Sequence, residues 1–488
     1  MNHMTTTIRC LIKVISPVHL GCDEVYEPMG FAVDESNQRL VVFDPVDFLA
    51  DLDEGNRKKF STICLQGTIS SILEIYGFVR RHSFSTRGRH VEVCPGFVDH
   101  YDQTLSIPKK NERKVAQELN NFIISRTAFL SDTQRPYLPG SAVKGAIRTA
   151  YLNLQAKKNR VPKPSGKHLG KELEKSLLKY SDIPLDPFRM VKVSDFLPVG
   201  EVKTKIVYAV NQKKNPSQHK ARGPQQILEV IEPGALFVGT VTVTRPEKGS
   251  GIKNPITMAD LQESIRSFYR REKEREDREL AQIALRGAPV DKADGEMLLR
   301  LGRHSGAESV TIEGYRRIRI MKGKGQQPGT LDRSTTFWLA SDQRKPTTIR
   351  GLRPFGWSLM REVTTELEEQ LQEQEAEFSR NQRSPVSENQ HVSSSGSLKR
   401  DDEQGFESLT VATPKTQPWQ KAVLTWTPGD GMLTAEWQGK TATIKGKELV
   451  PEVLHAKLFK KKKKVTANVT VEVLGENYFK IVSIGPDA

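Results

Sequence analysis

A long polar stretch constrains the fold most, because it divides the sequence into parts that must fold separately. It begins as a Glu/Gln-rich run from Glu366 to Glu377 and continues as Ser-, Asn- and Gln-rich sequence to Pro418. Residues 381–417 hold almost no aromatic side chains and cannot bury a core. We therefore predict a disordered linker over residues 366–418, followed by a small C-terminal domain over residues 419–488.

The C-terminal domain alternates between apolar and polar residues in short segments. Five of them predict strands: Lys421–Trp426, Met432–Trp437, Thr441–Lys445, Val465–Val473 and Tyr478–Ile484. Such a set of strands predicts a small, OB-like β-barrel. The run from Lys460 to Lys464 beside Phe459 fits either a solvated turn or a contact with nucleic acid or an acidic protein.

Residues 1–170 predict a first α+β domain. Ile8, Cys10, Ile12 and Val14 alternate on one face of a strand over residues 8–15. Asp44 and Pro45 are typical of a helix start. The remaining elements are a helix over about 57–77 and strands near 90–94 and 121–128. This order predicts a ferredoxin-like (RRM-type) domain with insertions.

Residues 171–365 predict a second half of the same kind. Pro233-Gly234 is expected to form the turn between paired strands. The predicted elements are strands Val191–Phe196, Thr204–Val210, Gln226–Glu232 and Ala235–Thr244, a helix over 257–283, and strands near 315–320, 334–340 and 355–363. The expected fold class is therefore α+β, with tandem ferredoxin-like domains followed by the barrel.

The stretch from Tyr137 to Tyr151 predicts a tight turn followed by a helix. Pro139 and Gly140 form the turn, and Ser141 stands where an N-cap residue is expected. Lys144 and Arg148 share one face of the helix. A helix N-terminus with free N–H groups and two nearby cations attracts phosphate, although a capped surface helix with solvated charges fits the same pattern.

The net charge of +15 favours a polyanionic partner, most simply a nucleic acid. No apolar run approaches the roughly 20 residues that would span a bilayer, so no membrane association is expected.

The N-terminus passes directly into a strand pattern without a signal-peptide core. The cysteines (Cys10, Cys22, Cys64 and Cys94) form no Cys-x-x-Cys pair, which indicates neither zinc nor disulfides and fits the cytoplasm.

Three further Gly-rich stretches are basic or aromatic: Arg300–Gly306, Lys322–Gly329 and Gly351–Trp357. Glycine lets the backbone approach a phosphate, arginine binds it, and aromatic rings stack on bases. Each stretch could also be a plain β-turn. Together with the turn-helix stretch they provide the candidate RNA-binding residues, which are Gly140, Ser141, Lys144, Gly145, Arg148, Arg300, Arg303, His304, Ser305, Gly306, Arg353, Phe355 and Trp357.

Motifs for nucleotide hydrolysis and for two common hydrolase classes are missing. The segment Gly140–Gly145 places its Lys before the second Gly and lacks the Lys-Ser/Thr pair of a P-loop. Neither His-Glu-x-x-His nor Gly-x-Ser-x-Gly occurs.

Four of these segments resemble one known family. Pro139–Arg148 resembles the turn-helix signature of the RAMP superfamily of CRISPR effector complexes, and Val14–Gly21, Arg300–Gly306 and Arg353–Trp357 strengthen the likeness. The resemblance covers about 1–363 and is greatest to the type III-A (Csm) subunit at the 3′ end of the guide RNA. It implies a non-catalytic crRNA-binding protein that caps a filament of RAMP-type subunits, with target RNA and maturation nucleases as further partners.

Two nuclease alternatives remain open at this point. Backbone subunits of these complexes cut target RNA with an acidic residue in the loop after the first strand, where Asp23 and Glu24 stand. Such a carboxylate would act with Mg²⁺, and no other cofactor or metal is expected. Alternatively, His19 or His304 could act as a general base in a crRNA-processing type of nuclease.

Overall fold

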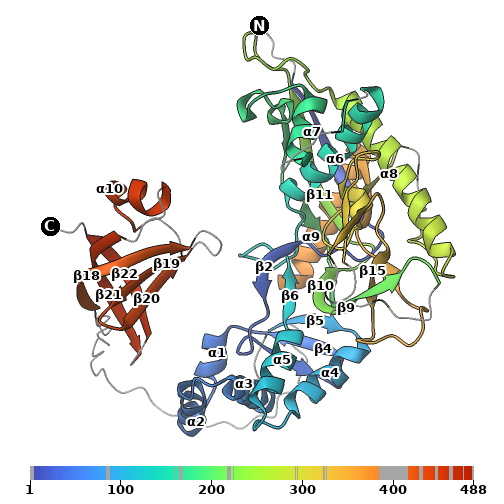
Figure 1. Cartoon of the computed structure of the whole chain (residues 1–488). Helices are drawn as coiled ribbons and strands as arrows, with labels where there is room; N and C mark the ends of the chain where they lie inside the picture. Colours follow the sequence, from blue (N-terminus) through green and yellow to red (C-terminus); the bar gives the residue numbers. More distant parts are fainter. Residues whose placement is uncertain are drawn as a thin grey trace, which may run out of the picture. The chain divides into compact units, whose positions relative to one another are not determined.

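The computed structural model describes residues 5–83, 88–159, 161–163, 169–216, 221, 223, 225–291, 293, 295–321, 325, 327–383, 416–427, 432–445, 449–460, 465–475 and 478–485. The chain divides into two compact units, Met1–Ser387 and Glu388–Ala488. Both are built mainly from strands and helices in mixed order, so the predicted α+β class is confirmed at this coarse level (Figure 1).

The first sheet is centred on β1 (Thr5–Val14), which confirms the strand predicted over residues 8–15. All of its neighbouring strands are antiparallel. In spatial order they are β12 (Met297–Arg300), β17 (Trp357–Glu362), β1, β11 (Leu236–Thr244) and β7 (Val191–Val193), with β8 (Leu197–Val199) also paired to β11.

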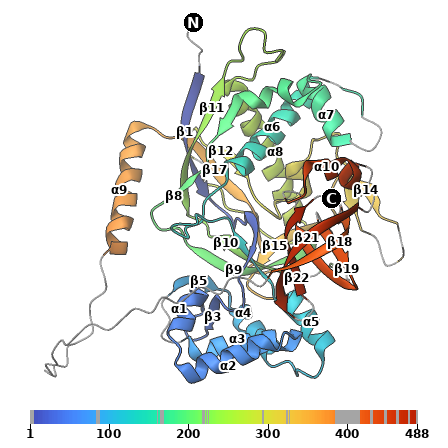
Figure 2. The same ribbon diagram turned by 90° about the vertical axis from the view of Figure 1, so that its left-hand side faces the viewer.

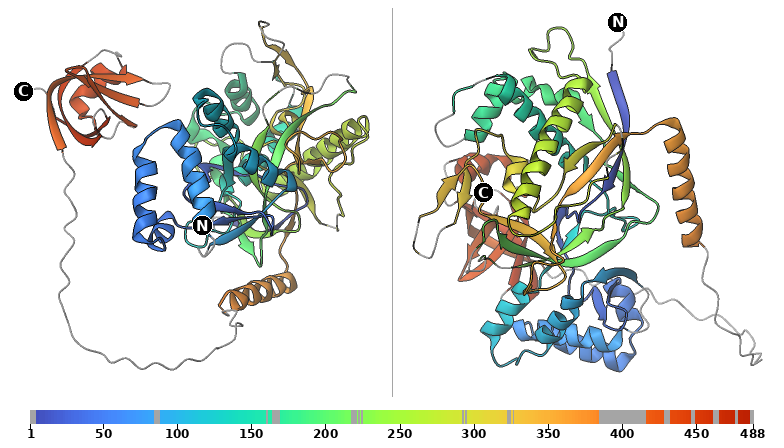
Figure 3. Two further views of the ribbon diagram at one scale, coloured as in Figure 1. Left: turned by 90° about the horizontal axis from the view of Figure 1, so that it is seen from below. Right: turned by 90° about the vertical axis from the view of Figure 1, so that its right-hand side faces the viewer.

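Helices cover both faces of the first sheet. Figures 2 and 3 show α6 (Gly140–Lys158) and α8 (Met258–Ala281) on one side and α9 (Thr365–Arg383) on the other. Cys10, Ile12 and Val14 face the main core under α6 and α8. Leu11 faces the opposite way and packs with Leu371 of α9. Because α9 covers this second face, Leu11 is buried although its side chain points away from the main core.

The second sheet is larger and mixes parallel with antiparallel pairs. In spatial order its strands are β2 (Gly21–Val25), β6 (Ile124–Thr127), β10 (Gln226–Ile231), β9 (Thr204–Lys213), β5 (Arg89–Val93), β4 (Arg39–Val42) and β3 (Phe31–Asp34), with β15 (Thr336–Ser341) on β9 and β16 (Arg353–Pro354) on β15. A separate hairpin joins β13 (Ile318–Ile320) to β14 (Gly329–Leu331).

Five helices gather with β3, β4 and β5 at one end of the first unit (Figures 1 and 3). They are α1 (Pro45–Ala50), α2 (Glu54–Leu65), α3 (Ile69–His82), α4 (Pro95–Leu105) and α5 (Glu112–Asn121). Asp44 caps α1 as predicted. The single helix predicted over 57–77 is wrong, because Gly67 adopts a left-handed φ of 59° and Thr68 caps a new helix.

The boundary predicted between residues 170 and 171 does not separate the two sheets. The first sheet joins β1 from the beginning of the chain to β11 and β17 from the later half. The strands on either side of Pro233-Gly234 are also not a pair, because β10 belongs to the second sheet and β11 to the first. Local sequence marks each strand but not its partner, which is chosen by contacts far away in the chain.

The remaining helices and short turns connect these layers: α7 (Leu169–Leu178), η1 (Ile183–Leu185), η2 (Pro187–Met190) and η3 (Ala307–Val310). The linker prediction is wrong over residues 366–383, which belong to α9 (Thr365–Arg383); residues 384–415 lie outside the described part. Glu375 of α9 accepts hydrogen bonds from Arg135 at 2.6 and 3.0 Å, which holds the polar helix against the unit.

The C-terminal unit contains the five predicted strands, and they close into a barrel in the order β18-β19-β20-β22-β21. Their bounds are β18 (Thr416–Thr427), β19 (Met432–Trp437), β20 (Lys440–Lys445), β21 (Val465–Gly475) and β22 (Tyr478–Gly485), with α10 (Glu452–His455) and the π-turn η4 (Ala456–Lys460) between β20 and β21. Trp419 is fully buried in its core and stacks on Trp437. Residues 461–464 of the lysine run lie outside the described residues.

Among the described helices, none has both the length and the apolar character needed to cross a membrane.

Candidate nucleic-acid interface

Three loops that lie far apart in the sequence meet at one place. They are residues 15–19, 301–306 and 355–357, which we call the three-loop junction. Main-chain hydrogen bonds join them: Gly356 N–H donates to the Pro17 carbonyl at 2.9 Å, and Leu301 N–H donates to the Gly356 carbonyl at 2.8 Å. Arg303 N–H donates to the His19 carbonyl at 2.8 Å. The junction therefore gathers three of the four segments that carry the family resemblance.

Two glycines make this close approach possible. Gly302 has a φ of 80°, and a Cβ added there would lie 2.3 Å from the His19 carbonyl oxygen. Gly356 has a φ of 90°, and its Cβ would lie 2.5 Å from the Leu301 carbonyl oxygen. Any other residue would be strained in φ and would collide with backbone. These glycines serve chain packing, rather than the contact with phosphate that the sequence suggested.

Three predicted RNA-binding residues are buried and serve the core. Arg300 pairs with Glu276 at 2.6 Å, and its guanidinium lies 4.8 Å from the Trp357 ring centre. The Trp357 indole N–H donates to the other oxygen of Glu276. Phe355 is fully buried. Arg300, Phe355 and Trp357 therefore have no surface to offer RNA, and their assignment as direct contacts is corrected here.

In the loop around His304, the side chains of His304 and Ser305 pack against the protein, whereas that of Arg303 is exposed. The His304 ring lies against Trp338 with centroids 4.6 Å apart, and its Nε2 is 3.0 Å from the Gln226 side-chain oxygen. Burial, aided by the Arg303 charge, lowers the pKa of His304 to about 3, so its imidazole is neutral. Ser305 is buried and donates to the Gly302 carbonyl at 2.8 Å. Arg303 is the exposed cation of this loop.

His19 lies beneath the same junction. Its side chain is fully buried, and its Nδ1 lies 2.7 Å from the Glu229 carbonyl oxygen. A carbonyl can only accept, so Nδ1 carries the proton. Burial lowers the pKa of His19. A general base for RNA cleavage must reach the 2′-hydroxyl it deprotonates, and this position gives His19 no such access.

Asp23 and Glu24 are exposed in β2. Asp23 adopts a left-handed φ of 60°, and Glu24 lies 3.6 Å from Arg126 in an ion pair. Over the part of the chain that the structure describes, no three His, Cys, Asp or Glu side chains come together in a way that could hold a metal ion. A metal at Asp23 or Glu24 would therefore need ligands from water or from the RNA.

The start of α6 differs from the capped helix that the sequence predicts. Pro139 occupies the N-cap position, and Ser141 is exposed without capping the helix. Gly140 N–H donates to the Asp195 carboxylate at 2.7 Å, so a carboxylate already occupies the site expected for phosphate. Gly140 is packed so tightly that a Cβ would lie 2.5 Å from the Ser194 carbonyl oxygen.

Arg148 is also held by carboxylates of the protein. Its guanidinium pairs with Glu174 at 2.7 Å and Asp186 at 3.0 Å, and it lies over the Phe188 ring. These contacts fix α6 to α7 and η2. Arg353 is likewise paired, with Glu232 at 3.5 Å and Asp342 at 3.8 Å. Neither guanidinium is free for a phosphate without losing these partners.

Lys144 remains available and has a neighbour that the sequence did not reveal. Burial lowers the pKa of Lys144, and the charge of Lys192 on β7 lowers it further. Within the described residues, neither lysine comes within ion-pair distance of a carboxylate. We call Lys144 and Lys192 the α6 lysine pair. No local signal could identify Lys192, because its strand reaches α6 only through the fold.

The structure therefore leaves a smaller set of candidates at the surface: Ser141, Lys144, Gly145, Arg303 and the added Lys192. Gly306 has a φ of 82° and shapes the Arg303 loop. Half of the Lys322–Gly329 stretch, residues 322–324 and 326, lies outside the described residues. What remains is a set of three cations, Lys144, Lys192 and Arg303, with no carboxylate within ion-pair distance among the described residues, and such cations attract anions.

Comparisons with known proteins identify one family. A model of the RAMP superfamily matches residues 11–306. The curated "CRISPR system Cms protein Csm5" of Methanocaldococcus jannaschii is 27% identical over 212 residues, which span 41% of this chain and 45% of that protein. The chain thus spans less than half the length of this relative. The protein of the same name from Streptococcus thermophilus is 26% identical over 356 residues, spanning 68% of this chain and 88% of its own.

Two solved structures are also similar. One is a chain of a Csm–crRNA–target RNA ternary complex of a type III-A CRISPR-Cas system, with a TM-score of 0.45, 19% identity, and coverage of 73% of this chain and 100% of that chain. The other is the crystal structure of T. onnurineus Csm5, with a TM-score of 0.41, 17% identity, and coverage of 72% and 99%.

Proposed function

Because this chain belongs to the RAMP superfamily, we propose that it is a non-catalytic, crRNA-binding subunit of a type III-A (Csm) CRISPR effector complex. In this role it caps the 3′ end of the guide in the cytoplasm and supports complex assembly and crRNA maturation in antiviral defence. Its partners are crRNA, target RNA and the other RAMP-type subunits, while maturation nucleases act on the same guide.

The three-loop junction is the observation that carries this proposal. Its main-chain hydrogen bonds and its two left-handed glycines hold the Arg303 loop in one conformation. A side chain presented from such a rigid frame loses little entropy when it binds, which favours affinity. Arg303 can therefore form a charge-assisted contact with a guide phosphate.

The α6 lysine pair supports the same function. A like charge lowers the affinity of a neighbouring lysine for its proton, and an anion that binds beside both charges relieves this repulsion. The pKa of Lys144 is lowered by burial first and then by the charge of Lys192. A phosphate of RNA is the anion that fits a chain with a net charge of +15.

The first sheet supports a ferredoxin-like assignment for the RNA-binding unit. Its elements follow in the order β1, α6, β7, β11, α8 and β17, which is the β-α-β-β-α-β succession of that fold. The insertions between them supply the second sheet and the helices α1 to α5. The finer description of two tandem ferredoxin-like domains remains a prediction.

The surroundings of the candidate catalytic residues support a non-catalytic role. His19 is buried, and the exposed Asp23 and Glu24 have no third metal-binding side chain beside them among the described residues. The five-stranded C-terminal barrel is proposed to be an OB-like appendage. Its removal at residue 419 is expected to leave the guide bound to the first unit.

Reconstitution of the effector complex tests the proposal. We expect RNA of uniform length to copurify with the complex, and longer or heterogeneous guides when this subunit is omitted. Labelled target RNA incubated with Mg²⁺ should give the same cuts for wild type and Asp23→Ala. Loss of a single cut position in the variant would replace the non-catalytic role with that of a RAMP ribonuclease.

A further inference from the structure

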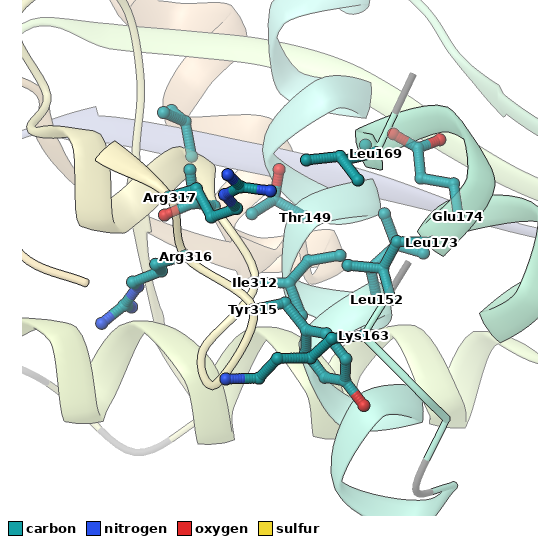
Figure 4. Close-up of a pocket in the computed structure, with 13 residues that line it drawn as sticks. Thr149, Leu152, Lys163, Leu169, Leu173, Glu174, Ile312, Tyr315, Arg316 and Arg317 are labelled. Carbon is teal, nitrogen blue, oxygen red and sulfur yellow. The ribbon is translucent and has the colours of Figure 1, made fainter. Parts of the chain in front are cut away.

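A pocket of about 640 Å³ lies between α6, the N-terminal turn of α7 and residues 310–317 (Figure 4). This volume is in the range of small-molecule sites. We propose that it takes one unstacked nucleobase of the bound RNA together with the adjacent phosphate. This inference rests on the proposed function and adds a base-binding site to the backbone contacts described above.

The walls of the pocket suit a flat, apolar ring. Leu152 of α6, Leu169 and Leu173 of α7, and Ile312 provide aliphatic surface, and Tyr315 adds an aromatic ring. In Figure 4 the leucines lie on the right of the view. Single-stranded bases stack on aromatic rings and pack on aliphatic side chains in RNA-binding proteins.

The wall formed by residues 310–315 is held in place by α6. The buried Asn153 accepts from Glu313 N–H at 2.8 Å and donates to the Thr311 carbonyl at 3.3 Å. The Tyr315 hydroxyl donates to the Val161 carbonyl at 2.6 Å, which fixes the ring. The pocket is thus preformed, so a base that enters does not have to order its walls.

Two cations at the pocket have no ion-pair partner within the described residues. Arg317 and Lys163 are exposed, and in Figure 4 their nitrogen atoms lie to the left of the Glu174 carboxylate. By contrast, Arg316 is held by Glu272 at 2.6 Å, and Glu174 is occupied by Arg148. The free charge at the pocket is therefore positive.

This combination distinguishes a nucleotide from an aliphatic side chain of a neighbouring subunit. An aliphatic side chain would pack against the leucines alone and would make no contact that uses the charges of Arg317 and Lys163. A nucleotide uses both parts, because its base fills the apolar space and its phosphate meets the cations.

Site-specific crosslinking to the full chain tests the inference. Single-stranded RNA carrying 4-thiouridine at each position in turn would be bound, irradiated and digested, and the crosslinked peptides identified by mass spectrometry. We expect one RNA position to crosslink to the segment 310–317. Removal of the base at that position should weaken binding about tenfold.

Two pairs of variants complete the test. Gly170 lines the pocket and has open space around it, so Gly170→Trp should fill the pocket and abolish the crosslink, whereas Gly170→Ala should not. Arg317→Ala should weaken binding about tenfold, whereas Arg319→Ala, which changes an exposed arginine of β13 outside the pocket, should have a smaller effect.

The outcomes separate this inference from the proposed function. If RNA binds with normal affinity but crosslinks elsewhere, or if Gly170→Trp leaves the crosslink unchanged, the pocket is not a base site while the RNA-binding role stands. If the wild-type chain, alone and in the assembled complex, binds no RNA, the proposed function and this inference both fail.

Discussion

Gly302 faces the carbonyl oxygen of His19 so closely that a Cβ at this position would lie 2.3 Å from that oxygen. The contact joins the loop after β12 to the loop after β1. It is therefore part of the frame that presents Arg303. The obstacle is backbone on both sides, so no side chain can turn away to make room.

Gly302→Ala is expected to destabilise the first unit by at least about 2 kcal/mol, because it adds backbone collision to an unfavourable left-handed φ. Urea unfolding followed by circular dichroism would measure the change. Gly145→Ala is the matched control, because Gly145 lies in α6 with open space around it. It should raise stability by about 0.5–1 kcal/mol. Equal effects of the two changes would contradict the packing role of Gly302.

Lys144→Ala and Lys192→Ala are each expected to weaken RNA binding and to reduce the slope of log affinity against log salt by about one. The physical reason is that each lysine releases about one counterion when it meets a phosphate. Fluorescence anisotropy with a labelled single-stranded RNA at several salt concentrations would measure the slope. Lys58→Ala, which removes an exposed lysine paired with Glu54 on α2, provides the control. An unchanged slope for both α6 variants would remove the lysine pair from the interface.

Arg300→Met is expected to cost about 3–5 kcal/mol of folding stability, because it leaves the buried Glu276 charge without its partner. Chemical denaturation would measure this loss. RNA affinity, expressed per folded molecule, should remain within about twofold of wild type, since Arg300 is buried. A stable variant that has lost RNA binding would restore the direct contact that the sequence suggested.

Acid should destabilise the first unit partly through His304. Its pKa is about 3 in the folded protein and near 6.5 when unfolded, so the unfolded chain binds an extra proton between these values. The contribution of the neutral ring to the free energy of unfolding is fully present above pH 6.5. It is lost as the pH falls toward 3, by up to about 1.4 kcal/mol per pH unit. Asn tolerates the left-handed φ of 64° at this position.

The comparison of wild type with His304→Asn isolates this effect, because the other titrating groups are common to both proteins. Free energies of unfolding at pH 7, 6 and 5 would be measured for each. The wild type should lose more stability than the variant as the pH falls. Parallel curves would show that His304 does not titrate as its surroundings imply.

The sequence predicted local elements better than it predicted their partners. Alternation identified β1, and the Asp44-Pro45 pattern identified the start of α1, because both depend on neighbouring residues. The pairing of β1 with β11 and β17 depends on contacts more than 200 residues away, which no local pattern records. The same reason explains why two sequential halves were expected where two interleaved sheets occur.

In the candidate site too, the sequence indicated local features but not the distant residues that contact them. Glycine-rich turns correctly marked positions of close approach, but the partner at Gly302 is the protein's own backbone rather than a phosphate. Arg148 was expected at the surface, yet Glu174 and Asp186 reach it from later elements. Among the described residues, Arg303 and the α6 lysine pair keep their positive charge available because no carboxylate comes within ion-pair distance of them.

Helix α9 changes how the second unit is attached. Its 19 residues form a rod of about 28 Å, and Arg135 and the Gly200 N–H hold Glu375 near its middle. The tether to the second unit therefore departs from the free end of this rod instead of from the end of β17. The docking of α9 through these hydrogen bonds therefore decides where the chain leaves the folded part of the first unit.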